Sequence, residues 1–268
     1  MGSYCGIHFD DLDVCVAKSF VPDHFCALFQ ESDRVVRRPS DPGADDTARD
    51  ELYETSRAVM LERLALLGCT RKVVHEAFEI WRQEEIASIE DGDLDEHDKQ
   101  FIAALTSLSF EEWQSRVSHV LRTQYSHSKP ADEIDRRMRE LDSSDSWLWF
   151  DGYGTHLNIR ALLDACTDVA NVSLDLSDLI GSGYLAKDVA LCADRRTNDP
   201  FGLRPLAPTV ILAEGSSDIR ILHRSLATLF PEKQDYFSFF NHSELKVDGG
   251  APYLWRATII LTGQRQLS

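Results

Sequence analysis

The chain has 268 residues, of which 28 are basic and 45 are acidic, so its formal net charge is −17. Hydrophobic residues make up 43% and charged residues 27%, an ordinary balance for a folded protein that excludes wholesale disorder, collagen and coiled-coil filaments. No apolar run approaches the roughly 20 residues of a membrane helix, and the N-terminus lacks the pattern of a secretory signal. We therefore expect a soluble, cytoplasmic protein without a membrane partner.

The charge is unevenly distributed along the chain. Residues 201–268 contain seven basic and six acidic residues, a net +1, so the first 200 residues carry −18. A surface that neutralises phosphates needs clustered lysine and arginine, which so acidic a body does not offer. Contact with nucleic acid therefore requires a local basic patch, a bridging metal or a partner. The six cysteines form no C-x-x-C pair, which indicates scattered reduced thiols.

The first half of the chain divides into a hairpin, a loop and a helical block. Two short β runs around an Asp-rich turn predict a β-hairpin over 4–20, and the polar, proline-containing segment 31–46 predicts a loop. Apolar residues then recur at three- and four-residue steps, which predicts an amphipathic helical bundle over 47–141. Its helices are expected over 47–67, ending at Gly68; from the cap Thr70 to Trp81; over 101–108; from the cap Ser109 to Leu121; and over 131–141.

The second half contains smaller α/β pieces. We expect strands at 147–150, within 171–180, at 209–212 and at 235–240, and helices at 155–170 and 219–230. Three prolines mark 194–208 as a linker, and the order strand, turn, helix, strand after it is that of a parallel α/β unit. The sequence thus predicts an α+β fold with an N-terminal domain over 1–193 and a partial α/β domain over 209–268. The N-terminal domain would contain the hairpin 4–20, the helical block 47–141 and a small α/β segment 147–186.

The stretch PTVILAEGSSDIRILHRSL carries the most chemical information. A buried strand would deliver Glu214 to its carboxyl end, which is where open α/β sheets bind ligands. Gly215 permits a tight turn, Ser216 or Ser217 can cap the next helix, and Asp218 lies in the first turn of that helix. Two carboxylates that converge there suit a hard divalent cation, and a helix N-terminus favours a phosphate. Such a site could polarise a phosphodiester and hold its attacking water.

The segment ILAEGSSD resembles the first motif of Toprim domains, and its E-G-x-x-D form is similar to that of the OLD-family nucleases. Three further stretches are MGSYCGIHFDDLDVCVAKSFV, YETSRAVMLERLALLGCT and DYFSFFNHSELKVDGGA. Together they resemble bacterial proteins in which a HEPN/Toprim N-terminal domain precedes a Toprim domain. The resemblance covers most of residues 1–252, and it implies defence against phages or mobile elements by cutting nucleic acid, DNA or RNA.

The resemblance implies a general acid/base and metal ligand at Glu214, a second metal ligand at Asp218, and Mg²⁺ or Mn²⁺ as the cofactor. Gly249 and Gly250 match a glycine pair that follows the second strand in these proteins. The D-x-D motif that should come later has no counterpart, because only 18 residues follow Gly250 and none is acidic. We therefore expect a C-terminally truncated chain that holds the metal weakly and cleaves poorly.

Arg122 and His127, with four residues between them, have the spacing of the HEPN ribonuclease signature, although Thr123 departs from it. On a helix this spacing places the two side chains within about a turn and a half of each other. The arginine could then steady a phosphate while the histidine moves a proton from the ribose 2′-OH. The alternative is that both are surface residues at a helix end.

Three functions of different classes are thus open. The first is Mg²⁺-dependent cleavage of nucleic acid through Glu214 and Asp218. The second is a non-catalytic interaction or regulatory module, in which the helical block assembles with a second copy of the chain or with a partner protein. The third is a metal-independent HEPN ribonuclease that uses Arg122 and His127.

Overall fold

The protein is represented by a computed structural model that describes residues 2–38, 50–91, 95–123, 134, 154–197, 209–213 and 215–241. The chain forms two compact units, the first comprising residues 1–200 and the second residues 201–268. The α+β fold class expected from the sequence is confirmed. In the described ranges, no helix combines the length and the apolar character that a membrane span requires.

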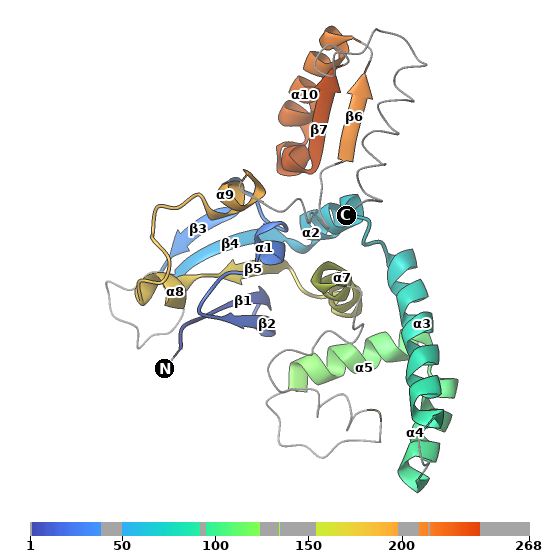
Figure 1. Ribbon diagram of the computed structural model, residues 1–268. Coiled ribbons are helices and arrows are strands. Elements are labelled where there is room, and N and C mark those ends of the chain that lie inside the picture. Colours follow the sequence, from blue (N-terminus) through green and yellow to red (C-terminus); the bar gives the residue numbers. More distant parts are fainter. Residues whose placement is uncertain are drawn as a thin grey trace. The chain divides into compact units, whose positions relative to one another are not determined.

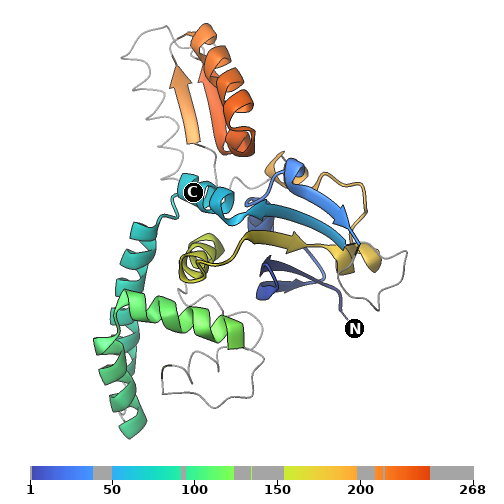
Figure 2. The same cartoon turned by 180° about the vertical axis from the view of Figure 1, so that it is seen from behind.

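The first unit is built on a five-stranded antiparallel sheet (Figures 1 and 2). β1 (Tyr4–Phe9) and β2 (Leu12–Lys18) form the expected hairpin. The other strands are β3 (Arg34–Arg37), β4 (Asp50–Ser56) and β5 (Asn171–Asp175). In space the order is β2-β1-β5-β4-β3, so the strand that comes last in the sequence of this unit lies at the centre of its sheet.

Asp10 joins the hairpin turn to β5. Its φ of 49° is in the left-handed region, which aspartate tolerates better than most residues. Its carboxylate oxygens accept hydrogen bonds from the backbone N–H groups of Ala170 at 2.8 Å and Asn171 at 2.9 Å. The backbone N–H of Asp10 in turn donates to the carbonyl oxygen of Asn171 at 3.0 Å. The Asp-rich turn therefore fixes where β5 begins beside β1.

Two strands show that local predictions were wrong. In the segment expected as a loop, 31–46, residues 31–37 form the 3₁₀ helix η1 (Glu31–Asp33) and β3, and residues 39–46 lie outside the described residues. The helix expected over 47–67 begins only at Arg57, because β4 precedes it. β3 pairs with β4, and β4 pairs with β5, which lies more than a hundred residues further along the chain. A pattern read over a short window does not contain that pairing.

The helices follow recognisable start and stop signals. α2 (Arg57–Leu66) is capped by Ser56, and Gly68, with a φ of 86°, ends it as expected. α3 (Arg71–Glu90) is capped by Thr70 as expected, but it continues past the expected end at Trp81. The helix expected over 101–108 begins earlier, at Glu96, and the helix expected after Ser109 is confirmed. The remaining helices of the unit are α1 (Asp23–Cys26), α4 (Glu96–Ser107), α5 (Phe110–Thr123), α7 (Thr155–Ala165), α8 (Ser177–Gly181) and α9 (Leu191–Thr197).

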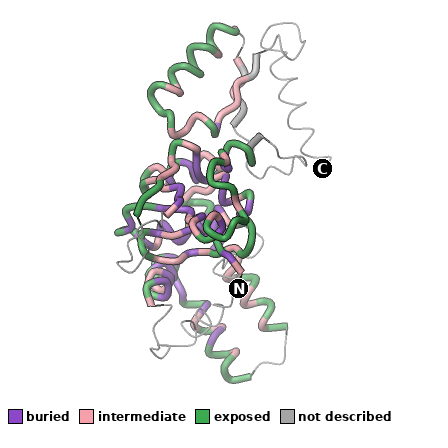
Figure 3. The backbone as a smooth tube through the Cα atoms, turned by 90° about the vertical axis from the view of Figure 1, so that its left-hand side faces the viewer, coloured by how far each residue is buried: buried purple, intermediate pink, exposed green. Residues whose placement is uncertain are grey.

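α7 is the helix on which three of the other described helices pack. It contacts α2, α3 and α5, and it joins them to the sheet through the short connection to β5. Its buried apolar residues belong to one core cluster with apolar residues of the sheet, and buried stretches of the backbone are purple in Figure 3. α7 ends at Ala165, so the helix expected over 155–170 is shorter than predicted. The helix expected over 131–141 and the strand over 147–150 lie outside the described residues, apart from Ile134, and α9 occupies the start of the expected linker 194–208.

The second unit is a small parallel α/β arrangement. It contains β6 (Thr209–Ala213), α10 (Ser216–Leu229), the 3₁₀ helix η2 (Pro231–Tyr236) and β7 (Phe237–Asn241). β6 and β7 are parallel neighbours, and α10 crosses between them and packs on both (Figure 1). This confirms the order strand, turn, helix, strand that the sequence predicts. α10 is exposed over most of its length, as its green tube in Figure 3 shows.

Candidate functional site

The candidate site lies at the carboxyl ends of β6 and β7. Because the strands are parallel and Ala213 lies opposite Asn241, both strands end at the same edge. Gly215 is the cap residue of α10 and has an extended backbone, with φ −113° and ψ 135°. Two residues therefore separate the end of β6 from the start of α10, and the N–H groups of Ser216 and Ser217 at the start of the helix lie at this edge.

The capping role expected of Ser216 or Ser217 is wrong, because both residues already belong to the first turn of α10. The preceding residue, Gly215, provides the change from extended to helical backbone. Its missing side chain matters for a steric reason, since a Cβ there would lie 3.0 Å from Oδ2 of Asp218. The Asp218 carboxylate thus turns back over Gly215.

Asp218 is exposed, and its backbone N–H donates to the carbonyl oxygen of Gly215 at 3.1 Å. A carboxylate in the first helical turn is stabilised by the helix dipole, and here it remains accessible to solvent and ligands. Its hard oxygen ligands suit Mg²⁺, which keeps several of its waters and needs few protein ligands. No group of three or more histidine, cysteine or acidic side chains that could hold a metal occurs among the described residues.

The other residues of this predicted site, Glu214, Gly249 and Gly250, lie outside the described residues. Glu214 occupies the single position between β6 and Gly215. The convergence of its carboxylate with that of Asp218 stays a prediction.

Arg122 lies in the last turn of α5, where it forms an ion pair with Asp168 in the connection between α7 and β5. Its Nε also donates to Oγ of Ser118 at 3.4 Å. Both members of the ion pair are partly exposed, so solvent weakens it. His127 lies outside the described residues, so its pairing with Arg122 stays a prediction. The observed role of Arg122 is to join the end of α5 to the segment that leads into β5.

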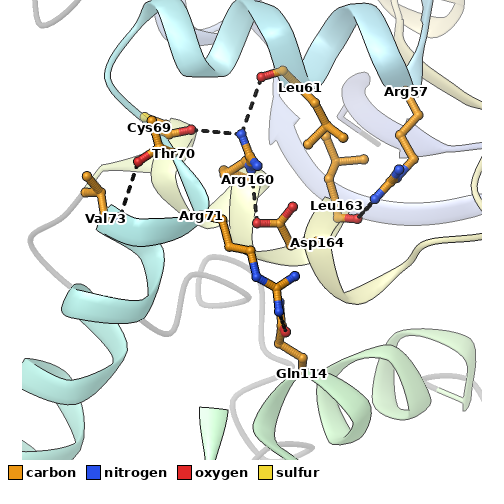
Figure 4. A network of polar contacts seen from close by, with 10 residues as sticks. All are labelled: Arg57, Leu61, Cys69, Thr70, Arg71, Val73, Gln114, Arg160, Leu163 and Asp164. Carbon is orange, nitrogen blue, oxygen red and sulfur yellow. Dashed lines mark hydrogen bonds and ion pairs between the residues drawn. The ribbon is translucent and has the colours of Figure 1, made fainter. Parts of the chain in front are cut away.

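A polar network that the sequence analysis missed holds the helices around α7 (Figure 4). Arg160 donates through Nε to Oδ2 of Asp164 at 3.0 Å, and both side chains are largely buried. One guanidinium nitrogen of Arg160 also donates to the carbonyl oxygens of Leu61 at 3.4 Å and Cys69 at 3.3 Å. These carbonyls belong to α2 and to the turn before α3, so one side chain ties both helices to α7. The only signal in the sequence is an arginine and an aspartate four residues apart on an apolar helix.

Two further arginines extend this network. Arg57 donates to the carbonyl oxygen of Leu163 through Nε at 3.3 Å and through a terminal nitrogen at 2.9 Å. Arg71 donates to Oε1 of the buried Gln114 at 3.2 Å and thereby links α3 to α5 (Figure 4). Polar contacts as well as apolar packing therefore fix the helices of the first unit.

A family model described as HEPN/Toprim N-terminal domain 1 matches residues 1–197, which span the five-stranded sheet and its helices. The chain belongs to the HEPN/Toprim N-terminal domain family. This membership indicates a nuclease-related protein that interacts with nucleic acid. No curated protein and no solved structure matches the chain. The family match ends before β6, so it does not extend to the site at α10.

Within the HEPN/Toprim N-terminal domain, several buried titratable groups serve packing. Burial lowers the pKa of His156 to about 4, and Nε2 of this residue donates to the carbonyl oxygen of His24 at 2.6 Å. Burial also raises the pKa of the Cys5 and Cys15 thiols to about 12. The histidine is therefore neutral and the thiols are protonated at neutral pH, and neither thiol is a ready nucleophile.

Arg63 forms the most deeply buried ion pair in the described part of this domain. Its side chain is fully buried, and it reaches the carboxylate of Asp33 at 2.5 Å and 3.1 Å. It also donates to the carbonyl oxygen of Leu28 at 3.2 Å. The pair anchors α2 to the segment before β3, and its guanidinium is fully buried, which indicates a structural role.

Proposed function

We propose that the chain acts on nucleic acid and that its second unit contains the first residues of a metal-dependent site for phosphodiester cleavage. The observation that carries this proposal is the edge shared by the parallel strands β6 and β7, with the first turn of α10 and the Asp218 carboxylate beside it. The membership of the HEPN/Toprim N-terminal domain family supports a nucleic-acid substrate. The family's role in defence against phages and mobile elements is proposed for this chain from its sequence resemblance.

Each residue at this edge has a defined chemical task in the proposal. Glu214 and Asp218 would hold Mg²⁺ or Mn²⁺, which when bound polarises a phosphodiester and makes a bound water more acidic. The N–H groups of Ser216 and Ser217 at the start of α10 would bind phosphate oxygens. Glu214 would also act as the general acid/base that transfers a proton to or from the reacting oxygen. Two carboxylates leave the metal with most of its waters, so its binding should tighten when substrate phosphates replace them.

Cleavage of labelled oligonucleotides by the purified full chain tests the proposal. We would measure products from single-stranded DNA, duplex DNA and RNA, each with Mg²⁺ and with EDTA. The proposal expects cleavage that EDTA abolishes and that Asp218→Asn and Glu214→Gln remove. Asp235→Asn is a matched control, because this exposed carboxylate precedes β7 at the opposite edge of the same two-stranded sheet and should leave cleavage unchanged.

Other outcomes distinguish the alternatives. Cleavage of RNA that resists EDTA and is lost in His127→Ala would replace the proposal with the metal-independent ribonuclease. Absence of cleavage under all conditions, together with a stable complex with another protein, would replace it with the interaction module. Cleavage unchanged in Asp218→Asn would show that the site at α10 does not carry out the cleavage.

A further inference from the structure

α10 presents two arginines to solvent on one side of the helix. Arg220 and Arg224 are four residues apart, which places them next to each other on the helix surface, and both are exposed. Neither has an ion-pair partner among the residues that the structure describes. They are therefore two adjacent positive charges that no carboxylate in the described part of the chain neutralises.

This arrangement contrasts with many basic side chains of the first unit. There, Lys72 pairs with Glu76 at 3.6 Å, and the basic residues Lys99, Arg116 and Arg160 also pair with carboxylates of their own helices. Such pairing is expected in a unit that carries a large excess of acid. On α10 the acidic residue is Asp218, which lies about 160° around the helix axis from Arg220 at 3.6 residues per turn. The geometry of the helix thus keeps the positive charges apart from the carboxylate.

The packing of α10 fixes where these charges point. Ile219 and Leu226 are half-buried, and the His223 ring meets the Phe239 ring of β7 edge to face at 5.5 Å. The side of α10 that carries these three residues therefore faces the strands. Arg220 and Arg224 lie beside this packed side of the helix. Measured along the helix axis, they are about 6 Å and 12 Å from Ser216, the first residue of α10. They form a short basic row that leads away from the edge where β6 and β7 end.

We infer that Arg220 and Arg224 bind the phosphodiester backbone of nucleic acid next to the phosphate that occupies the α10 site. This inference rests on the proposed function and specifies how an acidic chain holds a polyanion. Planar guanidinium groups bind phosphate oxygens through paired hydrogen bonds, and two of them spaced along a helix can contact successive phosphates. The row supplies the local basic patch that the net charge of the chain makes necessary.

The test is equilibrium binding of the full chain to a fluorescein-labelled 20-nucleotide strand, measured by anisotropy in EDTA so that no metal-dependent cleavage occurs. Single-stranded DNA, duplex DNA and RNA of one sequence are compared between 50 and 200 mM salt. The double variant Arg220→Gln/Arg224→Gln should bind roughly tenfold or more weakly. Its plot of log affinity against log salt should be shallower by about 1.4 for single strands or about 1.8 for duplex.

Lys72→Gln/Lys99→Gln is the matched control, because it removes the same charge from exposed positions of the first unit and should leave the slope unchanged. An unaltered slope in the arginine variant, or no binding by the unaltered chain, overturns the inference. Its failure is distinct from failure of the proposed function. If Asp218→Asn abolishes cleavage and the arginine variant binds nucleic acid normally, the α10 site stands and the basic row is refuted. If the arginine variant binds weakly and Asp218→Asn cleaves normally, the basic row stands and the α10 site is refuted.

Discussion

Acidification should destabilise the first unit through His156. This side chain is buried, with 7% of its surface exposed, and burial lowers its pKa from 6.5 to about 4. In the unfolded chain it titrates near its ordinary value. As the pH falls through the window between 6.5 and 4, the unfolded state binds a proton that the folded state does not bind. The free energy of unfolding therefore decreases with falling pH across this window.

The size of the effect follows from the shift in pKa. One pKa unit corresponds to about 1.4 kcal/mol, so the full loss below pH 4 is about 3 kcal/mol, and about 2 kcal/mol is lost by pH 5. Burial also lowers the pKa of the neighbouring His24, which adds to the loss in the same direction. Carboxylates of the chain also titrate at the low end of this range, so a variant is needed to isolate the histidine.

Urea denaturation at pH 7.5 and pH 5.0 measures the effect, with tryptophan fluorescence as the signal, since Trp113 is buried in α5. The variant His156→Gln keeps an N–H donor for the carbonyl oxygen of His24 but does not titrate. The unaltered chain should lose about 2 kcal/mol more than this variant between the two pH values. Equal losses in both proteins would refute the assignment of the buried neutral state to His156.

Three other changes test the packing of the first unit. Arg63→Met should lower the free energy of unfolding by about 3 kcal/mol in urea, because the largely covered Asp33 carboxylate would lose the buried guanidinium that it pairs with. A loss below about 1 kcal/mol would show that the pair is not anchored as described. Arg160→Met should lower the melting temperature clearly more than the matched change Arg116→Met. The ion pair of Arg116 is partly exposed and contributes roughly 1 kcal/mol or less to the free energy of unfolding. Equal effects of the two changes would argue against the network around α7. Asp10→Ala should speed hydrogen exchange at the amides of residues 170 and 171, which lose their carboxylate acceptors, and unchanged exchange would contradict this role.

The elements of the second unit could be predicted because their signals are local. An apolar run, a glycine, a pair of serines and an amphipathic stretch follow one another within a short window, and Pro231 ends the helix. Parallel pairing of β6 and β7 is then what a connection through one helix produces. The position of Asp218 in the first turn of the helix follows from the same signals. The identity of the N-cap could not be predicted from them, because it depends on the residue at which the backbone becomes helical, and that residue follows Gly215.

The sheet of the first unit could not be predicted in the same way. β5 lies between β1 and β4, with Leu174 opposite both Ile7 and Tyr53, so its partners are far away in the sequence. β4 carries acidic residues at its start and resembles the opening of a helix when read alone. Its strand conformation is set by pairing and burial, which outweigh weak local propensity.

The buried polar groups were missed for a related reason. Arg63 and Arg160 look like solvated helix residues in the sequence, and only the tertiary fold shows that each lies among backbone carbonyls that need donors. His156 similarly gains its partner from α1, more than a hundred residues earlier in the chain.

Binding of Mn²⁺ to the full chain, followed by loss of the free-ion signal in electron paramagnetic resonance, tests directly whether the chain holds a metal where β6 and β7 end. We expect weak binding at one site. Asp218→Asn and Glu214→Gln should each abolish it, and Asp235→Asn, at the opposite ends of the two strands, should leave it intact. Mn²⁺ binding of equal strength in Asp218→Asn and in the unaltered chain would contradict a metal site at the edge where β6 and β7 end.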